Sequence, residues 1–146
     1  MMNNEEQRYY VMTYGTLMRG RGNHTWMTTS QGEFIEEVVS TESDFVMYSV
    51  HESFPAITKN GDSNFYGELY AVPGQGIIYG LDYLEGYPTM YDRQIISCKG
   101  LSTGKDYKAL VYTFTPTASA SLGNNLLEPK QSKFIKYENN CYKWIG

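Results

Sequence analysis

The sequence has little of what metal centres, nucleic-acid interfaces and redox motifs require. Among its 146 residues there are only two cysteines, Cys98 and Cys141, which lie far apart and in no CxxC or His-rich setting. This spacing gives no metal site, and free thiols fit a reducing cytosol. The net charge is −4, and no basic tract exceeds the short Arg19-Gly-Arg21 cluster. That balance argues against a nucleic acid as partner.

Long apolar runs are missing as well. The N-terminal stretch MMNNEEQR lacks the apolar segment of a leader peptide. No apolar run approaches the ~18 residues that a membrane helix needs. We therefore expect a soluble, cytoplasmic protein with no membrane partner. The chain does have 41% hydrophobic residues and 14 tyrosines against 6 phenylalanines. This is enough for one domain with a substantial core, in which many hydroxyl groups need partners.

Turn residues divide the chain into short segments rich in β-branched and aromatic residues. The expected strands are 8–14, 32–39, 44–50, 64–72, 91–99 and 106–115, with a short extended piece at 54–57. Residues 24–30 favour a short helix and 117–123 resemble a surface loop, while the aromatic residues of 134–144 should pack back onto the domain. Six or seven strands with two helices predict an α+β fold whose mostly antiparallel sheet can close on itself.

The segment Pro73–Arg93 organises the rest of the chain. From Gly76 onward its apolar residues have helical spacing, because Ile77, Leu81 and Leu84 follow one another at i, i+4 and i+7, with Ile78 beside them. Gly86 then ends the helix as a cap and is followed by Pro88.

Glu85 occupies an unusual place on this predicted helix. At about 100° per residue it projects between Ile78 and Leu81, whereas Asp82 lies at the margin of the apolar face. Burial and the negative end of the helix dipole both raise the pKa of such a carboxylate, as proton transfer near neutral pH requires. The alternative is a structural Glu85 that turns out to water or pairs with Arg93, itself a candidate for a salt bridge at the start of a strand.

A second candidate site is the loop Tyr14-Gly15-Thr16-Leu17 at the end of the first strand. A strand that ends at glycine can turn sharply and point successive backbone N–H groups into one concavity, which suits a carboxylate or another anion. The alternative is a plain turn. The loop is not a phosphate-binding P-loop, since no GxxxxGK[ST] pattern occurs.

Five motifs in order extend this interpretation. YGTLMRGRGNH (Tyr14–His24), FPAI (Phe54–Ile57), YGELY (Tyr66–Tyr70), LDYLEGYPTMYDR (Leu81–Arg93) and ALVYTF (Ala109–Phe114) resemble the gamma-glutamylcyclotransferase-like superfamily. The gamma-glutamylamine cyclotransferase branch is the most similar. The resemblance covers about three-quarters of the chain, residues 9–115, and the tail after Pro116 matches none of its motifs.

The resemblance implies a small, mostly antiparallel β-barrel flanked by short helices. It implies a single domain over residues 1–146, with a core at about 8–115 and a tail at 116–146. It also implies release of 5-oxoproline from a gamma-glutamyl amine or amino acid without metal or cofactor. The loop residues Tyr14, Gly15, Thr16 and Leu17 would bind the substrate, and Glu85 would be the catalytic acid and base. We expect a monomer whose partner is a small gamma-glutamyl compound.

The chemistry of this class agrees with the residues. A gamma-glutamyl group carries its own nucleophile, the α-amine, so no Ser or Cys nucleophile is required, and none is indicated here. One carboxylate with a raised pKa can take a proton and return it, and N–H groups of the loop can stabilise the oxyanion. The identity of the leaving amine stays open. The alternative is a non-catalytic binding module on the same fold.

Overall fold

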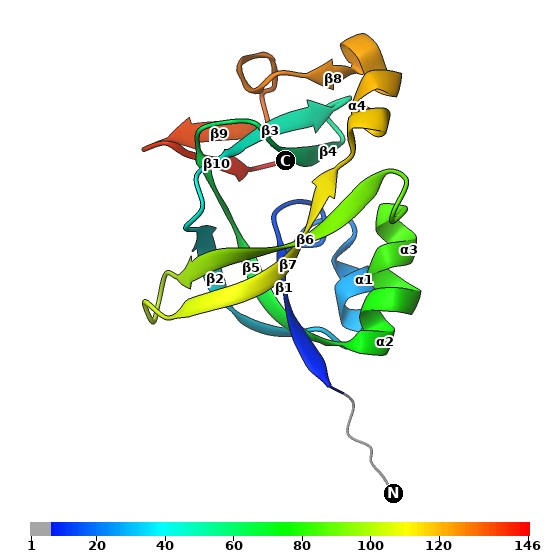
Figure 1. The fold of residues 1–146 in the computed structure, drawn as a ribbon, viewed down its shortest axis with the longest axis vertical. Coiled ribbons are helices and arrows are strands. Elements are labelled where there is room, and N and C mark those ends of the chain that lie inside the picture. Colours follow the sequence, from blue (N-terminus) through cyan, green and yellow to red (C-terminus); the bar gives the residue numbers. More distant parts are fainter. Residues whose placement is uncertain (1–6) are drawn as a thin grey trace, which may run out of the picture.

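The computed structural model describes residues 7–146, and a closed barrel lies at its centre (Figure 1). Five strands close the barrel in the order β1-β7-β6-β2-β5, with β5 pairing back onto β1. The pair β1–β7 is parallel and the other four pairs are antiparallel. The barrel strands are β1 (Arg8–Thr13), β2 (Glu33–Ser40), β5 (Asn64–Pro73), β6 (Tyr91–Gly100) and β7 (Asp106–Phe114). The predicted α+β class and the mostly antiparallel, closed sheet are confirmed.

Alternation of side chains explains why these segments become barrel strands. In β7, Tyr107, Ala109 and Val111 are buried in the interior, while Asp106 and Lys108, which alternate with them, are exposed. Successive residues of a strand point to opposite faces, so this pattern fills one face and solvates the other.

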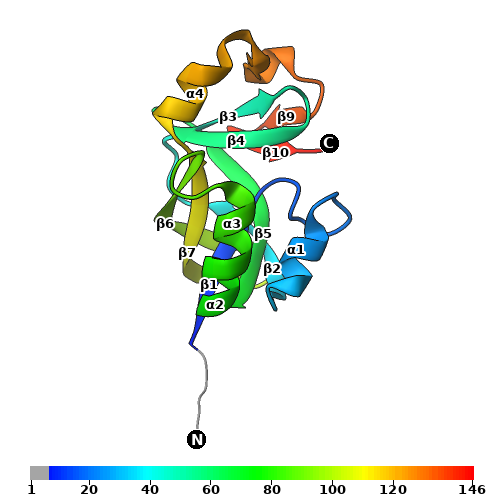
Figure 2. The same ribbon diagram turned by 90° about the vertical axis from the view of Figure 1, so that its right-hand side faces the viewer.

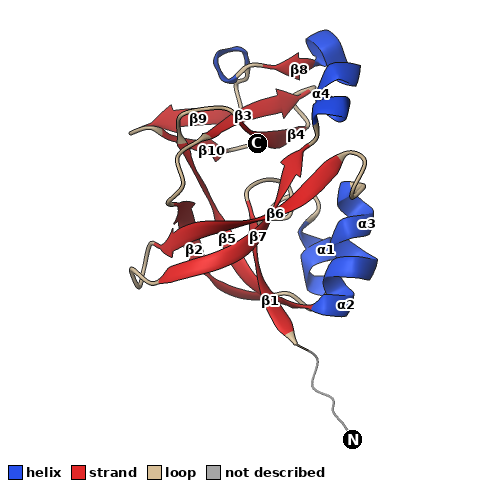
Figure 3. Ribbon diagram, in the orientation of Figure 1, coloured by secondary structure: helices blue, strands red, loops and turns tan. Residues whose placement is uncertain are grey.

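Further strands cover one end of the barrel (Figure 3). They are β3 (Phe45–Val50), β4 (Phe54–Lys59), β8 (Leu126–Leu127), β9 (Ile135–Glu138) and β10 (Cys141–Trp144). The hairpin β9–β10 attaches through β10, which runs parallel to β5. Residues 7–146 therefore contain ten strands, and the expected six or seven was wrong, because the strands of the tail are only two to four residues long. Tyr142 and Trp144 are buried, as expected of the aromatic tail, whereas Tyr137 of the same tail is exposed.

Helices lie along one side of the barrel (Figure 2), where they pack against residues of β1, β5 and β7. They are α1 (His24–Thr29) and a continuous run of α2 (Gly74–Gly76), the π-helical turn η1 (Ile77–Leu81) and α3 (Asp82–Glu85). Gly86 ends this run in the left-handed conformation, with φ of 66°, so the predicted cap is confirmed. Among residues 7–146, no helix is long and apolar enough to cross a membrane.

The segment after β7 is helical, and the expectation of a surface loop at 117–123 was wrong. It forms α4 (Pro116–Leu122), followed by the 3₁₀ turns η2 (Gly123–Asn125) and η3 (Pro129–Gln131). The Thr115 hydroxyl accepts a hydrogen bond from the Ala118 N–H, and Pro116 occupies the first turn. A capping threonine and an N-terminal proline stabilise a helix start even in a Ser- and Ala-rich segment.

The core consists of two clusters of buried side chains. One includes Met12, Val38, Phe65, Leu69 and Val111 and fills the barrel up to the covering strands. The other joins the barrel to the helices and includes Val11, Met27, Tyr70, Val72, Ile77, Leu81, Tyr91, Tyr112 and Phe114. The candidate site lies where the second cluster meets the loop after β1.

Candidate active site

Glu85 and the loop after β1 line the same small cavity, although they are about 70 residues apart in the sequence. The cavity has a volume of about 40 Å³. The loop contributes Tyr14, Gly15, Thr16 and Leu17, and α3 contributes Glu85. The remaining lining residues are Met12, Thr13, Phe54, Pro55, Tyr91 and Tyr112. All the candidate site residues from the sequence are therefore brought together in one place.

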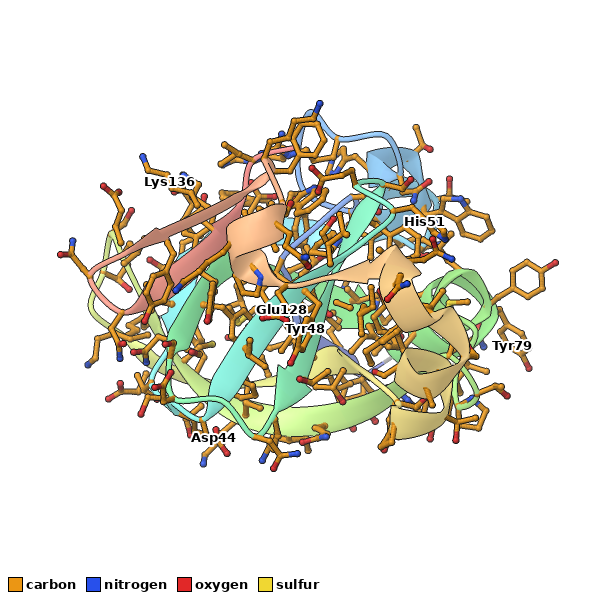
Figure 4. All side chains as sticks on the ribbon, turned by 90° about the horizontal axis from the view of Figure 1, so that it is seen from above. Asp44, Tyr48, His51, Tyr79, Glu128 and Lys136 are labelled. Atoms are coloured by element: carbon orange, nitrogen blue, oxygen red, sulfur yellow. The ribbon has the colours of Figure 1, made fainter. Side chains whose placement is uncertain are left out.

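The helix reaches this cavity with a phase that differs from the predicted one. Ile77 and Leu81 are buried as expected, but Ile78 is 56% exposed. Tyr79 is 78% exposed and points away from the molecule (Figure 4). The π-helical turn η1 inserts one extra residue, which rotates everything after it by about 100° relative to a regular helix. Glu85 therefore faces the cavity, whereas Ile78 faces solvent, so the two do not share a buried face.

Asp82 is buried, and the expectation that it lies at the margin of the helix face was wrong. Its Oδ1 atom accepts a hydrogen bond of 2.6 Å from the Tyr112 hydroxyl and lies 3.4 Å from Arg93 Nε. Arg93 and Tyr112 are directly opposite each other in the β6–β7 ladder, so one carboxylate can meet both. The ion pair of Arg93 is therefore with Asp82, and the suggested partner Glu85 does not take part.

Glu85 is half-buried, and its carboxyl group lies at the cavity without a compensating donor in the described part of the chain. Within residues 7–146, no hydrogen bond or ion pair reaches it, and burial raises its pKa from 4.5 to about 7. Loss of hydration disfavours the charged form of a carboxyl group, and no nearby cation offsets this loss. A carboxyl group with this pKa can gain or lose a proton near neutral pH.

Three tyrosine hydroxyls around the cavity are directed away from Glu85. Tyr14 donates to the Tyr112 carbonyl at 2.7 Å, Tyr91 donates to the Pro55 carbonyl at 3.0 Å, and Tyr112 donates to Asp82. Burial raises the pKa of all three hydroxyls above the ordinary phenol value, so they stay protonated. The Tyr14 hydroxyl also accepts from the Ile57 N–H, so the Tyr14 side chain holds the strands together while the backbone beside it borders the cavity.

The loop after β1 needs glycine because another chain segment lies against it. A Cβ atom at Gly15 would lie 2.6 Å from Cγ of Pro55, which is closer than such atoms approach. Within residues 7–146, the backbone N–H groups of Gly15, Thr16 and Leu17 donate to no protein acceptor, whereas the Met18 N–H closes the turn onto the Gly15 carbonyl. Successive N–H groups without acceptors, next to a cavity, are able to bind a carboxylate or an oxyanion.

Residues beyond the cavity hold the loop in place. Asn23 donates from its side chain to the Thr16 hydroxyl and from its N–H to the Thr16 carbonyl, both at 2.9 Å. The buried Glu68 accepts from the N–H of Arg19 at 2.9 Å and from its Nε at 3.1 Å. These contacts fix both sides of the turn, so the free N–H groups keep their direction without a ligand.

Sequence reasoning did not assign a role to the residues that complete the cavity wall. Phe54 and Pro55 belong to FPAI, Tyr91 to the MYDR end of a motif, and Tyr112 to ALVYTF. The motifs contained the signal, but only the barrel shows that β4, β6 and β7 converge on the loop. Within residues 7–146, no group of three or more His, Cys, Asp or Glu side chains is placed to hold a metal ion.

Comparison with known proteins agrees with the resemblance that the sequence motifs indicate. The family model described as "Gamma-glutamyl cyclotransferase, AIG2-like" matches residues 11–134. The chain belongs to this family. The match continues into the tail after Pro116, where the sequence motifs did not extend.

Relatives of this cyclotransferase family differ in how much of their length the chain spans. It is 31% identical to "Gamma-glutamylaminecyclotransferase A" of Danio rerio, over 73% of this chain and 71% of the relative. It is 36% identical to "Putative gamma-glutamylcyclotransferase CG2811" of Drosophila melanogaster over 58% of this chain, which spans just over half (56%) of that relative. The crystal structure of a mouse AIG2-like protein is similar with a TM-score of 0.70 and 25% identity, over 87% of this chain and 89% of the other.

Proposed function

We propose that this chain is a gamma-glutamyl cyclotransferase that releases 5-oxoproline from a gamma-glutamyl amine or gamma-glutamyl amino acid. Glu85 is the general acid and base in this proposal, and the backbone of Gly15, Thr16 and Leu17 binds the gamma-glutamyl group. The observation that carries it is a single cavity with a carboxyl group lacking donors and a row of N–H groups lacking acceptors.

The reaction begins with the α-ammonium group of the substrate. Ionised Glu85 takes one proton from it, and the freed amine nitrogen attacks the γ-carbonyl carbon to close a five-membered ring. The carbonyl oxygen becomes an oxyanion, which N–H groups of the loop stabilise. The bond between this carbon and the leaving nitrogen then breaks as Glu85 gives its proton to that nitrogen, and the ring nitrogen releases its second proton to water. The products are 5-oxoproline and the free amine, and Glu85 is ionised again.

The pKa of Glu85 suits both proton transfers. An ordinary glutamate is a weak base for an ammonium group and, being ionised at neutral pH, has no proton to give. A pKa of about 7 brings the two forms close in free energy at working pH. Ring closure within one substrate molecule is favoured when the chain is held folded, so the small cavity can contribute by orientation alone.

The cavity of about 40 Å³ limits what it can enclose. We infer that it holds the part of the substrate around the reacting carbonyl, while the leaving amine extends outside. The leaving group is then either a simple amine, the side chain of lysine, or an amino acid. The name of the Danio rerio relative favours a gamma-glutamylamine.

A panel of gamma-glutamyl compounds tests the proposal by mass spectrometric detection of 5-oxoproline. It should include gamma-glutamyl-ε-lysine, gamma-glutamyl amino acids and gamma-glutamyl alkylamines. Two matched controls belong in it: the α-glutamyl isomers and substrates with an acetylated α-amine, in which the nucleophile is blocked. We expect release from at least one member of the panel and none from its acetylated counterpart. Binding of the panel without any release would instead support a binding module on the same fold.

A further inference from the structure

We propose that Asp82 is a positioning residue that holds the hydroxyl hydrogen of Tyr112 away from the Glu85 carboxylate. Asp82 and Glu85 lie three residues apart at the end of one helical run, and Tyr112 lines the cavity that Glu85 faces. The role of Asp82 in catalysis rests on the function proposed above, whereas the placement of the hydroxyl hydrogen can be tested without turnover.

Asp82 is well placed to fix the Tyr112 hydroxyl. The distance from this hydroxyl to Asp82 Oδ1 is 2.6 Å, the length of a strong hydrogen bond to a charged acceptor. The Asp82 side chain is 11% exposed, so water competes little for the same oxygen. Arg93 Nε lies 3.4 Å from the same Oδ1 atom, so a cation stands beside this acceptor.

A tyrosine hydroxyl has a single hydrogen to donate. While that hydrogen points at Asp82, Tyr112 offers Glu85 only the oxygen, which does not stabilise a negative charge. A donor that turned to Glu85 would stabilise its ionised form and lower its pKa. The carboxylate would then be a weaker base for the ammonium group and would hold too few protons to supply the leaving amine.

The other two tyrosines that line the cavity already donate elsewhere, so Tyr112 is the tyrosine donor to be controlled. Tyr14, after β1, already donates to the Tyr112 carbonyl and accepts from Ile57. Tyr91, in β6, donates to the Pro55 carbonyl. Both of these acceptors belong to the backbone, so no side-chain substitution removes them. The acceptor of the Tyr112 hydroxyl is instead a side chain, that of Asp82, so a substitution can remove it.

Arg93 is the charged group that must be separated from this effect. It lies in β6 opposite Tyr112 and pairs with Asp82. Removal of Asp82 leaves its positive charge without this partner, and that charge would also lower the pKa of Glu85. The experiment therefore needs a variant in which Asp82 is absent and the Tyr112 hydroxyl is absent too.

The test is an NMR titration of the Glu85 carboxyl carbon in protein labelled with ¹³C-glutamate, with the signal assigned by its loss in Glu85→Gln. In Asp82→Ala we expect the Glu85 pKa to fall by about one to two pH units, the size of one hydrogen bond to a charged group. In Asp82→Asn the side-chain oxygen can still accept from Tyr112, so the fall should be less than half as large. In Asp82→Ala combined with Tyr112→Phe the pKa should return close to the wild-type value.

Two results would overturn the proposal. One is an unchanged Glu85 pKa in Asp82→Ala. The other is an equal fall in the single and the double variant, which would assign the effect to the charge of Arg93. If Asp82→Ala does not fold, Asp82→Ser provides a polar side chain that is too short to replace the carboxylate, with the same expected fall.

Activity gives a second readout that also separates this proposal from the proposed function. With a substrate from the panel, the acid limb of the pH profile of kcat/KM should move down with the Glu85 pKa in Asp82→Ala. A shifted NMR titration with no 5-oxoproline release from any substrate would support the placement of the hydroxyl and contradict the proposed function. Release of 5-oxoproline together with an unchanged Glu85 pKa in Asp82→Ala would support the proposed function and contradict the placement of the hydroxyl.

Discussion

Glu36 and Glu85 are two enclosed carboxylates whose surroundings have opposite effects. Glu36, in β2, accepts hydrogen bonds from the Thr103 side chain and from the Tyr107 hydroxyl at 2.5 Å. It also accepts from the N–H groups of Ser102 and Thr103. These bonds, with that of the Thr103 side chain foremost, lower the pKa of Glu36. Glu85 receives no such bond within residues 7–146, and burial raises its pKa to about 7.

The difference shows that enclosure alone does not decide the protonation of a carboxyl group. Donors compensate Glu36 for lost hydration, and they tie the loop between β6 and β7 to β2. Around Glu85 the three tyrosine hydroxyls of the cavity are directed to other acceptors. A fully satisfied carboxylate stabilises the fold, whereas an unsatisfied one costs stability and is suited to chemistry. The same substitution at both positions should therefore have opposite consequences.

The largest expected effect is on activity. Glu85→Gln removes the group that transfers protons and should lower kcat for 5-oxoproline release by about 10²–10⁴-fold. Glu36→Gln is the matched control, because it makes the same chemical change away from the cavity and should keep near wild-type kcat. Assays with one substrate from the panel compare the two. Near-full turnover by Glu85→Gln would remove this residue from the mechanism.

The next effect concerns the loop that faces Glu85. Gly15→Val would place atoms within 2.6 Å of the Pro55 ring, so β4 or the loop must move. We expect overpacking to cost about 1–3 kcal/mol of unfolding free energy and the displaced N–H groups to weaken binding of a substrate analogue by at least about tenfold, or roughly 1.4 kcal/mol.

Gly22→Val in the same connection is its control. A Cβ atom there meets nothing within 4 Å, and the change should stay within about 0.5 kcal/mol. Calorimetric binding and chemical denaturation would measure both variants. A stability loss in Gly15→Val with unchanged binding would indicate that the loop is only a turn.

Glu36→Gln should lower the stability of the fold, because Glu36 has a structural role. An amide group at this position places an NH₂ against the donors of Thr103 and Tyr107, so the variant should melt several degrees below wild type at pH 7. The lowered folded pKa means that the contribution of Glu36 is present above the unfolded pKa and is lost as the pH falls through the folded value. The difference between the two melting temperatures should therefore shrink on acidification. A constant difference would mean that ionisation of Glu36 has no part in it.

Much of the fold could be predicted because its signals are local. Turn residues and segments rich in β-branched and aromatic residues indicated the barrel strands, and Gly86 marked the end of the helix that carries Glu85. The tail was harder to predict, since its strands are short and the helix start at Thr115-Pro116 lies in a segment with loop-like composition. The capping signal was present there but had less weight than the Ser- and Ala-rich sequence.

The sequence predicted which residues form the candidate site, but not the contacts that surround them. Motif resemblance placed Glu85 and the loop together, whereas spacing alone left both open. The role of Asp82 was missed because a regular helix was assumed, and the π-helical turn before it changes which residues face inward. The cross-strand pairing of Arg93 with Tyr112, which brings both to Asp82, depends on the register of β6 and β7. This register is set by the loop that joins the two strands and by the face that each strand buries, so neither strand encodes it alone.

Thermal melts of wild type and Glu85→Gln at pH 5 and pH 8 test the central claim without any substrate. Because the folded pKa of Glu85 is raised, the folded protein keeps its proton between pH 4.5 and 7 while the unfolded chain loses it, so wild-type stability falls across that window. The full cost is up to about 3 kcal/mol, and glutamine removes it. The account predicts similar melting temperatures at pH 5 and a variant that melts several degrees above wild type at pH 8. A variant clearly less stable than wild type at pH 8 would show that ionised Glu85 has a stabilising partner, and would contradict the account.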